Sequence, residues 1–441
     1  MKTLAKSALG VAVAAAVAAT SVQASEAVTM DPSLTFTYKN YYFDTNNKDA
    51  GKKSGHDWSH ALIADFDTGY VNDLVGAVVT AGYAGPLDVD SGFATNVAGG
   101  SDGKQDDAIS GFQQAYLKAK HSFSGVDFEG TVGVKKRGLE TYSDSGSRVL
   151  AASSTGFDLS VGFEGANLYY TELTGFSERN TSTLSNDLVL GYTEYGADID
   201  SEDDDTDVQL AVEKIQILGA TYSYEGLDLA AEYGKSKEAV QQTLLKAGYS
   251  FELDDVSSVD LDARYGRSKS AGNLGDKAFG SDYKSKYYNL NATYNYGSAY
   301  VGVGYNKTKD NDYVDYYVSG NNDSFNSSLA QWEDYSLAEE KAYLVSAGYN
   351  FADQGLDGLS WDLWYAKGTD AKEIVDFKRR EYGSYVSYAF DGSLEGLSLA
   401  WLYVNYRAQG GADDAKDQGR LASLYDADIN RLYLTYSVAA F

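Results

Sequence analysis

The residues that could do acid–base, nucleophilic or metal chemistry are few in this chain of 441 residues, apart from the carboxylates. Cysteine is absent, so thiol chemistry and cysteine-ligated metals are excluded and an exported form does not depend on disulfides. None of the three histidines, His56, His60 and His121, is placed where a Ser/His dyad would need it. There is also no zinc-helix motif, phosphate loop or dinucleotide fingerprint. We therefore expect neither an enzyme nor a cofactor.

Carboxylates dominate the charge, with 64 Asp and Glu against 36 Lys and Arg and a formal net charge of −28. Nucleic acid is thus an unsuitable partner, and a glycosidase-like carboxylate pair cannot be recognised because such pairs arise everywhere. Two acidic runs, 198–207 (DIDSEDDDTD) and 310–315, lack the central glycine and distal glutamate of a calcium loop. We expect solvated loop tips there. The alternative is that divalent cations bridge them to lipopolysaccharide.

The first 24 residues read as a secretory signal peptide. Lys2 and Lys6 precede an apolar run, 8–19, and a small-residue cleavage site ends at Ala24. The run is too short for a spanning helix, which needs about 20 apolar residues. Residues 25–441 therefore form the mature chain.

From there to the C-terminus, apolar and polar residues alternate with a period of two, as in Val259, Leu261, Ala263 and Tyr265. This pattern predicts about eighteen strands. They are 34–45, 58–66, 74–83, 113–123, 128–135, 157–163, 166–173, 214–224, 227–233, 243–251, 259–265, 287–296, 299–305, 343–351, 359–366, 383–390, 397–406 and 431–438.

The connections between these strands are alternately short and long. Short gaps such as 164–165 and 225–226 alternate with long ones such as 174–213 and 306–341. A soluble β-sandwich, the alternative for an exported all-β chain, has no reason to place all short turns at one rim. The pattern predicts a single transmembrane antiparallel β-barrel of about 18 strands, with periplasmic turns, extracellular loops and a watery lumen.

The last residues, RLYLTYSVAAF, form an alternating strand that ends at Phe441. A terminal aromatic residue resembles the signal by which outer-membrane barrels are recognised for insertion. We therefore expect the bacterial outer membrane as the location, with the barrel-assembly machinery, outer-membrane lipid and lipopolysaccharide as partners.

Several segments resemble the OprD family of substrate-specific outer-membrane porins. The first region is the most specific, with NYYF at 40–43, Trp58, TGYVNDLVG at 68–76 and LDVDSG at 87–92. Further matches are Ser147 with Arg148, TGF at 155–157, FEG at 163–165, and Arg431, Leu432 and Tyr436 in the last strand. The resemblance runs nearly end to end. It implies an 18-stranded monomeric or loosely associated barrel for small hydrophilic solutes, with loops folded inward to narrow the pore.

Members of that family commonly carry a ladder of basic residues up one lumen wall. The matching positions here are Lys39, Lys118, Lys120, Arg148, Arg407 and Arg431, and by alternation alone Arg264 also points inward. In a chain this acidic, an anion crosses only if local fixed cations offset the general field. The alternative interpretation is that these basic residues are ordinary lumen-facing charges, of which any water-filled barrel has many.

The chain also departs from the family pattern. Positions where relatives often have basic residues hold Thr131, Thr221, Trp364, Ala400 and Leu402. Trp364, on the expected lumen side, could stack on sugar rings. We expect a porin for passive diffusion of small polar solutes, with some preference for carboxylate-bearing or amphoteric ones. The alternatives are a chitooligosaccharide-type channel of the same family and a non-conducting structural or adhesive barrel.

Overall fold

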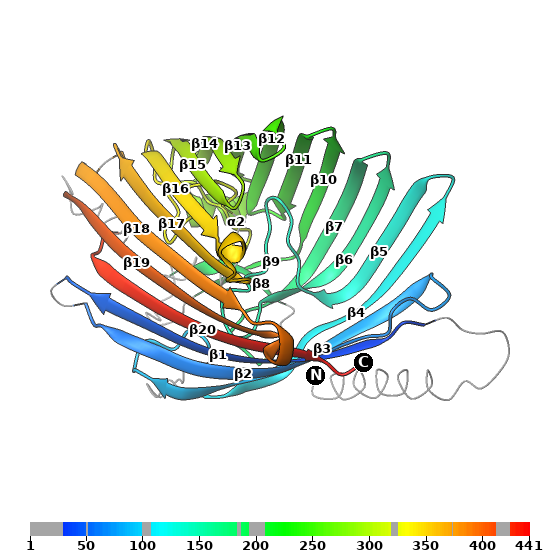
Figure 1. Cartoon of the computed structure of the whole chain (residues 1–441). Coiled ribbons are helices and arrows are strands. Elements are labelled where there is room, and N and C mark those ends of the chain that lie inside the picture. Colours follow the sequence, from blue (N-terminus) through cyan, green and yellow to red (C-terminus); the bar gives the residue numbers. More distant parts are fainter. Residues whose placement is uncertain are drawn as a thin grey trace.

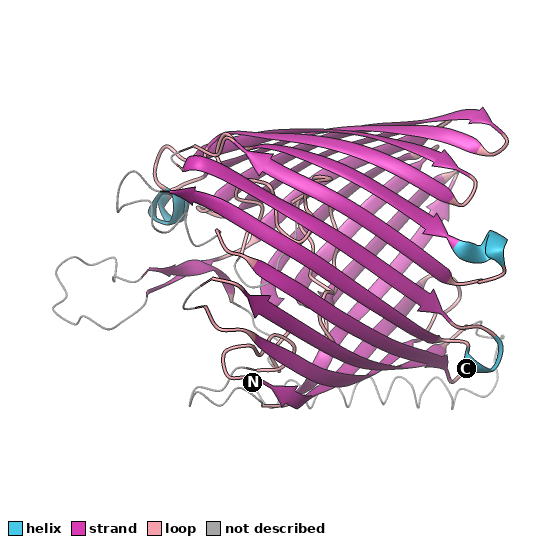
Figure 2. Cartoon of the chain, turned by 60° about the vertical axis from the view of Figure 1, so that its left-hand side comes forward, coloured by secondary structure: helices cyan, strands magenta, loops and turns pink. Residues whose placement is uncertain are grey.

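The computed structural model describes residues 30–49, 52–98, 107–182, 187–193, 208–318, 325–372, 374–411 and 424–441. Within them, eighteen strands form one antiparallel sheet (Figure 1). The sheet closes because β1 (Ser33–Asn47) pairs with β20 (Ala427–Ala439). The predicted barrel is confirmed, and its tilted strands enclose a single interior (Figure 2). The predicted signal peptide and the acidic run 198–207 lie outside the described residues.

Each barrel strand pairs with the next one along the chain, except that β7 pairs with β10. The other strands are β2 (Gly55–Asp67), β3 (Val75–Val89), β4 (Ile109–Phe123), β5 (Val126–Lys135), β6 (Ser153–Phe163), β7 (Ala166–Ser177), β8 (Leu188–Thr193), β9 (Val208–Val212), β10 (Ile215–Tyr224), β11 (Leu227–Ser236), β12 (Val240–Asp254), β13 (Ser257–Ser270), β14 (Lys284–Tyr296), β15 (Ala299–Asp310), β16 (Lys341–Asn350), β17 (Leu359–Thr369), β18 (Val375–Ala389) and β19 (Leu397–Gly411).

Alternation along every barrel strand sets one apolar face outward. Each strand presents at least one exposed large apolar side chain on that face, as expected where lipid is the outer solvent. In barrel order these include Phe36, Leu62, Tyr83, Leu117, Val132, Leu159, Leu168, Leu218, Leu229, Leu245, Leu261, Leu290, Val303, Val345, Leu363, Tyr382, Trp401 and Leu432. The residues assigned to the lipid side from sequence are therefore on that side.

The predicted alternation of short turns and long loops holds only in part, because two connections at the end expected to carry long loops are short: 237–239 between β11 and β12, and 370–374 between β17 and β18. Ser124–Gly125, Glu164–Gly165 and Glu225–Gly226 have positive φ at both residues. Two successive left-handed residues make a type I′ turn, whose twist matches that of the flanking strands, and glycine takes the second position without steric cost. All three turns lie at the same end of the barrel, here called the short-turn end. The opposite end is the long-loop end.

The strands are longer than the sequence pattern indicated, mainly at the long-loop end. β18 begins at Val375, whereas the sequence pattern placed its start at 383. The first part of the strand was missed because its charged residues, such as Arg379 and Glu381, resemble a polar connection, although both side chains are buried under a loop. The predicted loop 174–213 contains the β8–β9 hairpin, and a short helix, α2 (Asn273–Phe279), precedes β14. Two 3-10 turns, η1 (Phe351–Gln354) and η2 (Gly392–Leu394), complete the elements. Among the described residues, no helix is long and apolar enough to cross a membrane.

Loop segments lie inside the barrel (Figure 1), and three of them that pack on the inner wall in the described part of the chain are called the infolded loops below. Their described parts are 90–98 after β3, 136–152 after β5, and 311–318 with 325–340 after β15. Their apolar side chains join inward wall residues in buried clusters, and one such cluster holds Leu150 together with Ala61 and Ala84. The hydrophobic core thus lies inside the barrel and leaves a narrowed lumen.

Asp310 ends β15, and the rest of the acidic stretch, 311–315, belongs to the third infolded loop, so the expectation of a solvated loop tip is wrong there. Tyr313 is only 7% exposed, and Asp312 accepts a hydrogen bond from the backbone N–H of Ala338 at 2.6 Å. The apolar Tyr313 draws the segment inward, where the carboxylate gains a backbone partner.

Candidate functional site: the narrowed lumen

Three buried wall carboxylates hold the infolded loops in place: Asp57, Glu232 and Glu381, each at most 2% exposed. Each accepts hydrogen bonds from two consecutive backbone N–H groups of one loop. The donors are Thr95 and Asn96 on Asp57 (2.7 and 2.9 Å), Glu140 and Thr141 on Glu232 (3.1 and 2.6 Å), and Trp332 and Glu333 on Glu381 (3.1 and 3.3 Å). A buried carboxylate with several donors is costly to disrupt, so each fixes where its loop crosses the lumen.

The second infolded loop brings Arg148 to Arg431 of β20. Both guanidinium groups lie over the ring of Phe43 on β1, with Cζ to centroid distances of 5.3 and 4.1 Å. Arg179 joins them through a shared hydroxyl, since the Oγ of Ser147 accepts from Arg179 at 2.7 Å and from Arg148 at 3.1 Å. The predicted Arg148 and Arg431 are therefore brought together.

Two lysines add to this side of the lumen. Lys39 points inward from β1, with its Nζ 5.6 Å from the ring of Tyr41, and it lies close enough to Lys136 for the two ammonium groups to repel each other. Lys136 follows β5 and its Nζ reaches Gly146 in the second infolded loop. We call Lys39, Lys136, Arg148, Arg179 and Arg431 the basic cluster.

Four members of the basic cluster lack an ion-pair partner. Among the described residues, Lys39, Lys136, Arg148 and Arg431 form no salt bridge with a carboxylate. Burial, together with the nearby Arg179 and Arg431, lowers the pKa of Arg148 to about 9. Like charges held together in a partly dehydrated passage favour an incoming anion.

Lys118 and Lys120 also face inward, but they lie at the short-turn end and are paired. Lys118 contacts Asp67 at 2.6 Å, Lys120 contacts Asp73 at 2.5 Å, and both ammonium groups lie over the ring of Tyr70, at 4.4 and 4.5 Å. They are separate from the basic cluster, and their charge is locally balanced.

Arg264 points inward from β13, as alternation predicted, on the side of the ring opposite β1 in strand order. It contacts Asp262 at 2.7 Å and Asn326 at 2.7 Å. Nearby, a lumen cavity of about 400 Å³ is lined by residues that include Glu140, Asp228, Asp260, Asp262 and Lys246. The two sides of the lumen thus differ in charge, one basic and one mainly acidic.

Arg407 does not line the lumen, so the prediction that it does is wrong. It has the same parity in β19 as Leu399 and Trp401, both exposed on the outer face. Its guanidinium binds Asp428 of β20 at 2.8 Å. On the outer face of β19, apolar side chains such as Trp401 thus give way near the long-loop end to an ion pair.

Trp364 does face inward from β17, but its ring is largely engaged. The indole N–H donates to Glu381 at 2.6 Å, and the ring lies directly against Gly383 on β18, where any side chain would clash. It also packs beneath the third infolded loop. It supports that loop.

Two of the histidines, His56 and His60, have partners outside the basic cluster. His60 is outward on β2 between the rings of Tyr38 and Tyr83, and His56 contacts Asp88 and Asp90 at 3.1 and 2.9 Å. Within the described ranges, no group of three or more His, Cys, Asp or Glu is placed to hold a metal ion.

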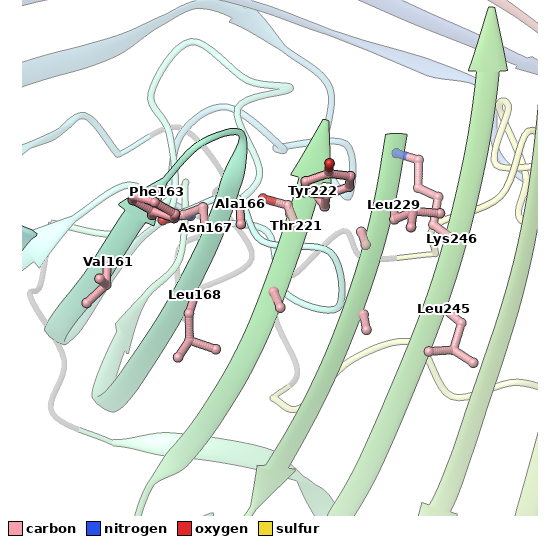
Figure 3. Close-up of a pocket in the computed structure, with 13 residues that line it drawn as sticks. Val161, Phe163, Ala166, Asn167, Leu168, Thr221, Tyr222, Leu229, Leu245 and Lys246 are labelled. Carbon is pink, nitrogen blue, oxygen red and sulfur yellow. The ribbon is translucent and has the colours of Figure 1, made fainter. Parts of the chain in front are cut away.

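An apolar groove of about 520 Å³ lies on the outer face of β6, β7, β10, β11 and β12 (Figure 3). Leu168, Leu229 and Leu245 line it, and all three belong to the outward set. A polar solute has no reason to enter this groove.

Sequence reasoning missed four members of the lumen site: Phe43, Lys136, Arg179 and Trp332, whose ring centroid lies 4.4 Å from Cζ of Arg431. The basic run KKR at 135–137 was a usable signal for Lys136. Nothing in the sequence pointed to Trp332, because it lies in a loop without periodicity.

The apolar outer face, the closed sheet and the polar lumen narrowed by loops define a transmembrane β-barrel channel. A family model described as outer membrane porin, OprD family, matches residues 28–439. The chain therefore belongs to this family, and it is an outer-membrane porin. The resemblance noted in the sequence is confirmed.

Known relatives agree with this assignment. Porin D of Pseudomonas aeruginosa is 26% identical over 393 residues, which cover 85% of this chain and 82% of that protein. The crystal structure of P. aeruginosa OccK9 (OpdG) covers 93% of this chain and 98% of its own, at a TM-score of 0.77 and 18% identity. That of P. aeruginosa OpdK with vanillate covers 93% and 99%, at a TM-score of 0.74 and 18% identity. At these identities the solved structures support the fold.

Proposed function

We propose that this porin passes small hydrophilic solutes by passive diffusion and prefers carboxylate-bearing or amphoteric ones. The observation that carries the proposal is the basic cluster, in which Lys39, Lys136, Arg148 and Arg431 have no carboxylate partner among the described residues. Fixed cations in a narrow passage attract an anion and replace part of its hydration.

The net negative charge of the chain strengthens the case that the basic cluster serves anions. The chain has a formal net charge of −28, so its general field repels anions. Only a local group of cations offsets this field along the solute path. The acidic lining across the lumen gives an amphoteric solute a place for its cationic end, near Asp260 and Asp262.

A related channel supports the same solute class. OpdK, which shares the fold, was solved with vanillate, a small carboxylate. The mechanism in this chain needs no covalent step: the solute exchanges some water for Arg and Lys donors, and then moves on because no single contact is strong.

Planar-bilayer recording tests the proposal. In a KCl gradient the wild-type channel is expected to show a reversal potential on the anion-selective side. A doubly neutral variant, Arg148→Gln with Arg431→Gln, should move that potential toward cation selectivity. A wild-type channel that selects cations would overturn the proposed preference, and a silent barrel would favour the structural alternative.

A further inference from the structure

The guanidinium of Arg431 is covered by two aromatic rings from different parts of the chain. Phe43 is its cross-strand partner on β1, with its ring centroid 4.1 Å from Cζ. Trp332, in the third infolded loop, lies 4.4 Å from the same atom. Both centroids lie close to the same Cζ, yet no ring contact joins Phe43 to Trp332 within the described residues, as expected when two rings lie on different faces of one guanidinium. In that arrangement the rings cover the faces of the guanidinium and leave its edge to the lumen.

The loop holds Trp332 firmly at this place. Its backbone N–H donates to Glu381 at 3.1 Å, and its indole N–H donates to the hydroxyl of Tyr425 at 3.0 Å. Tyr425 in turn donates to Glu333 at 2.5 Å. The ring is thus fixed from β18 and from the segment before β20, so Arg431 meets an ordered partner.

The donors of a guanidinium all lie in its plane, where two of them match the two oxygens of a carboxylate. When rings cover both faces, a ligand can approach only along the edge. A flat anion fits this approach, whereas a sulfonate or phosphate has oxygens that project toward the flanking rings. Arg431 has no carboxylate partner of its own in the described part of the chain, so its edge is available to a solute.

We propose that Trp332 is a specificity-determining residue which, with Phe43, restricts Arg431 to edge-on hydrogen bonding and so favours flat anions over tetrahedral ones. This inference rests on the anion preference proposed above. It assigns selectivity by shape to an uncharged loop residue, and selectivity by charge to the basic cluster.

The test compares acetate, which is flat at its charged end, with methanesulfonate, which is not, by bi-ionic reversal potentials. The wild-type channel should favour acetate. Trp332→Leu should lower the acetate-to-methanesulfonate permeability ratio about threefold, the scale of one cation–π contact. Trp332→Phe keeps a ring and should retain most of the ratio. Trp401→Leu, on the outer face, is the matched control and should leave it unchanged.

Phe43→Leu removes the second ring from the barrel wall without touching the third infolded loop, and should lower the same ratio if Trp332→Leu fails to assemble. Each channel's conductance in KCl reports assembly. If the wild type is not anion-selective in KCl, the proposed function fails. If it is anion-selective but the acetate-to-methanesulfonate ratio is equal in the wild type, Trp332→Leu and Phe43→Leu, the shape inference is wrong and the proposed function stands.

Discussion

Arg148 and Arg431 lie over the same ring, that of Phe43, although one comes from an infolded loop and the other from the last strand. Two like charges held this close repel each other, and the ring offsets only part of that repulsion. An anion between them lowers the electrostatic energy of both. We therefore expect the double replacement by glutamine to reduce the anion-to-cation permeability ratio about three- to tenfold, measured as a reversal potential in a KCl gradient. Arg407→Gln on the outer face is the control.

The lysines at the short-turn end give a contrasting prediction. Because Lys118 is paired with Asp67, the combined variant Lys118→Met with Asp67→Asn removes both charges and should leave the reversal potential in a KCl gradient close to that of the wild type. Lys39→Met, which removes an unpaired charge, should shift it toward cations. Equal shifts in the two channels would contradict this dependence on pairing.

The clamp on the second infolded loop should control channel noise. Glu232 accepts hydrogen bonds from two backbone N–H groups of this loop and from Tyr169. Glu232→Gln replaces an acceptor oxygen by a donor, and should cost about 1–3 kcal/mol of stability. Single-channel records should show more frequent partial closures. Glu225→Gln, at a short turn, should record like the wild type, and a quiet Glu232→Gln channel would count against the clamp.

The geometry of Trp364 gives a prediction about sugars. With its indole N–H bound to Glu381 and its ring against Gly383, the residue has little free surface for a sugar ring. Current blockages by chitooligosaccharides should therefore have the same dwell times in the wild type and in Trp364→Phe. Markedly shorter blockages in the variant would restore the oligosaccharide channel as the better interpretation.

A buried acid in the second infolded loop predicts a pH dependence. Burial raises the pKa of Asp144 to about 6, although Arg137, Ser154 and Tyr142 donate hydrogen bonds to it. The pKa of Asp144 is higher in the folded than in the unfolded protein, so protonation of Asp144 stabilises the fold. This contribution to the free energy of unfolding is full below about pH 4 and is lost as the pH rises through about 6. From pH 7.5 to pH 5, the wild type should gain about 1 kcal/mol relative to Asp144→Asn in thermal unfolding of the detergent-solubilised barrel. A constant difference would contradict this.

Most of the fold could be predicted from the sequence because lipid and water impose an alternation that each strand must satisfy alone. Leu117 and Val132 face outward for that reason. The short gap at Glu164–Gly165 is a two-residue turn, and a gap of that length is visible in the sequence. The long-loop end resisted prediction, since β18 runs beneath a loop and its charged residues resemble a connection.

The site was only partly predictable, because side-chain direction follows from alternation but contact between distant segments does not. Lys39, Arg148, Arg264 and Arg431 face the lumen as expected, whereas the assignment of Arg407 overlooked the parity of its strand. Trp332 reaches Arg431 only through the folding of the third infolded loop, which leaves no periodic trace.

The wall carboxylates bind their loops through backbone N–H groups, and every residue except proline has such a group. A loop can therefore exchange nearly all its side chains during evolution and still be seated at the same height in the pore. Such a scaffold lets new filters arise by drift in the loops alone, without re-engineering the membrane wall that carries them.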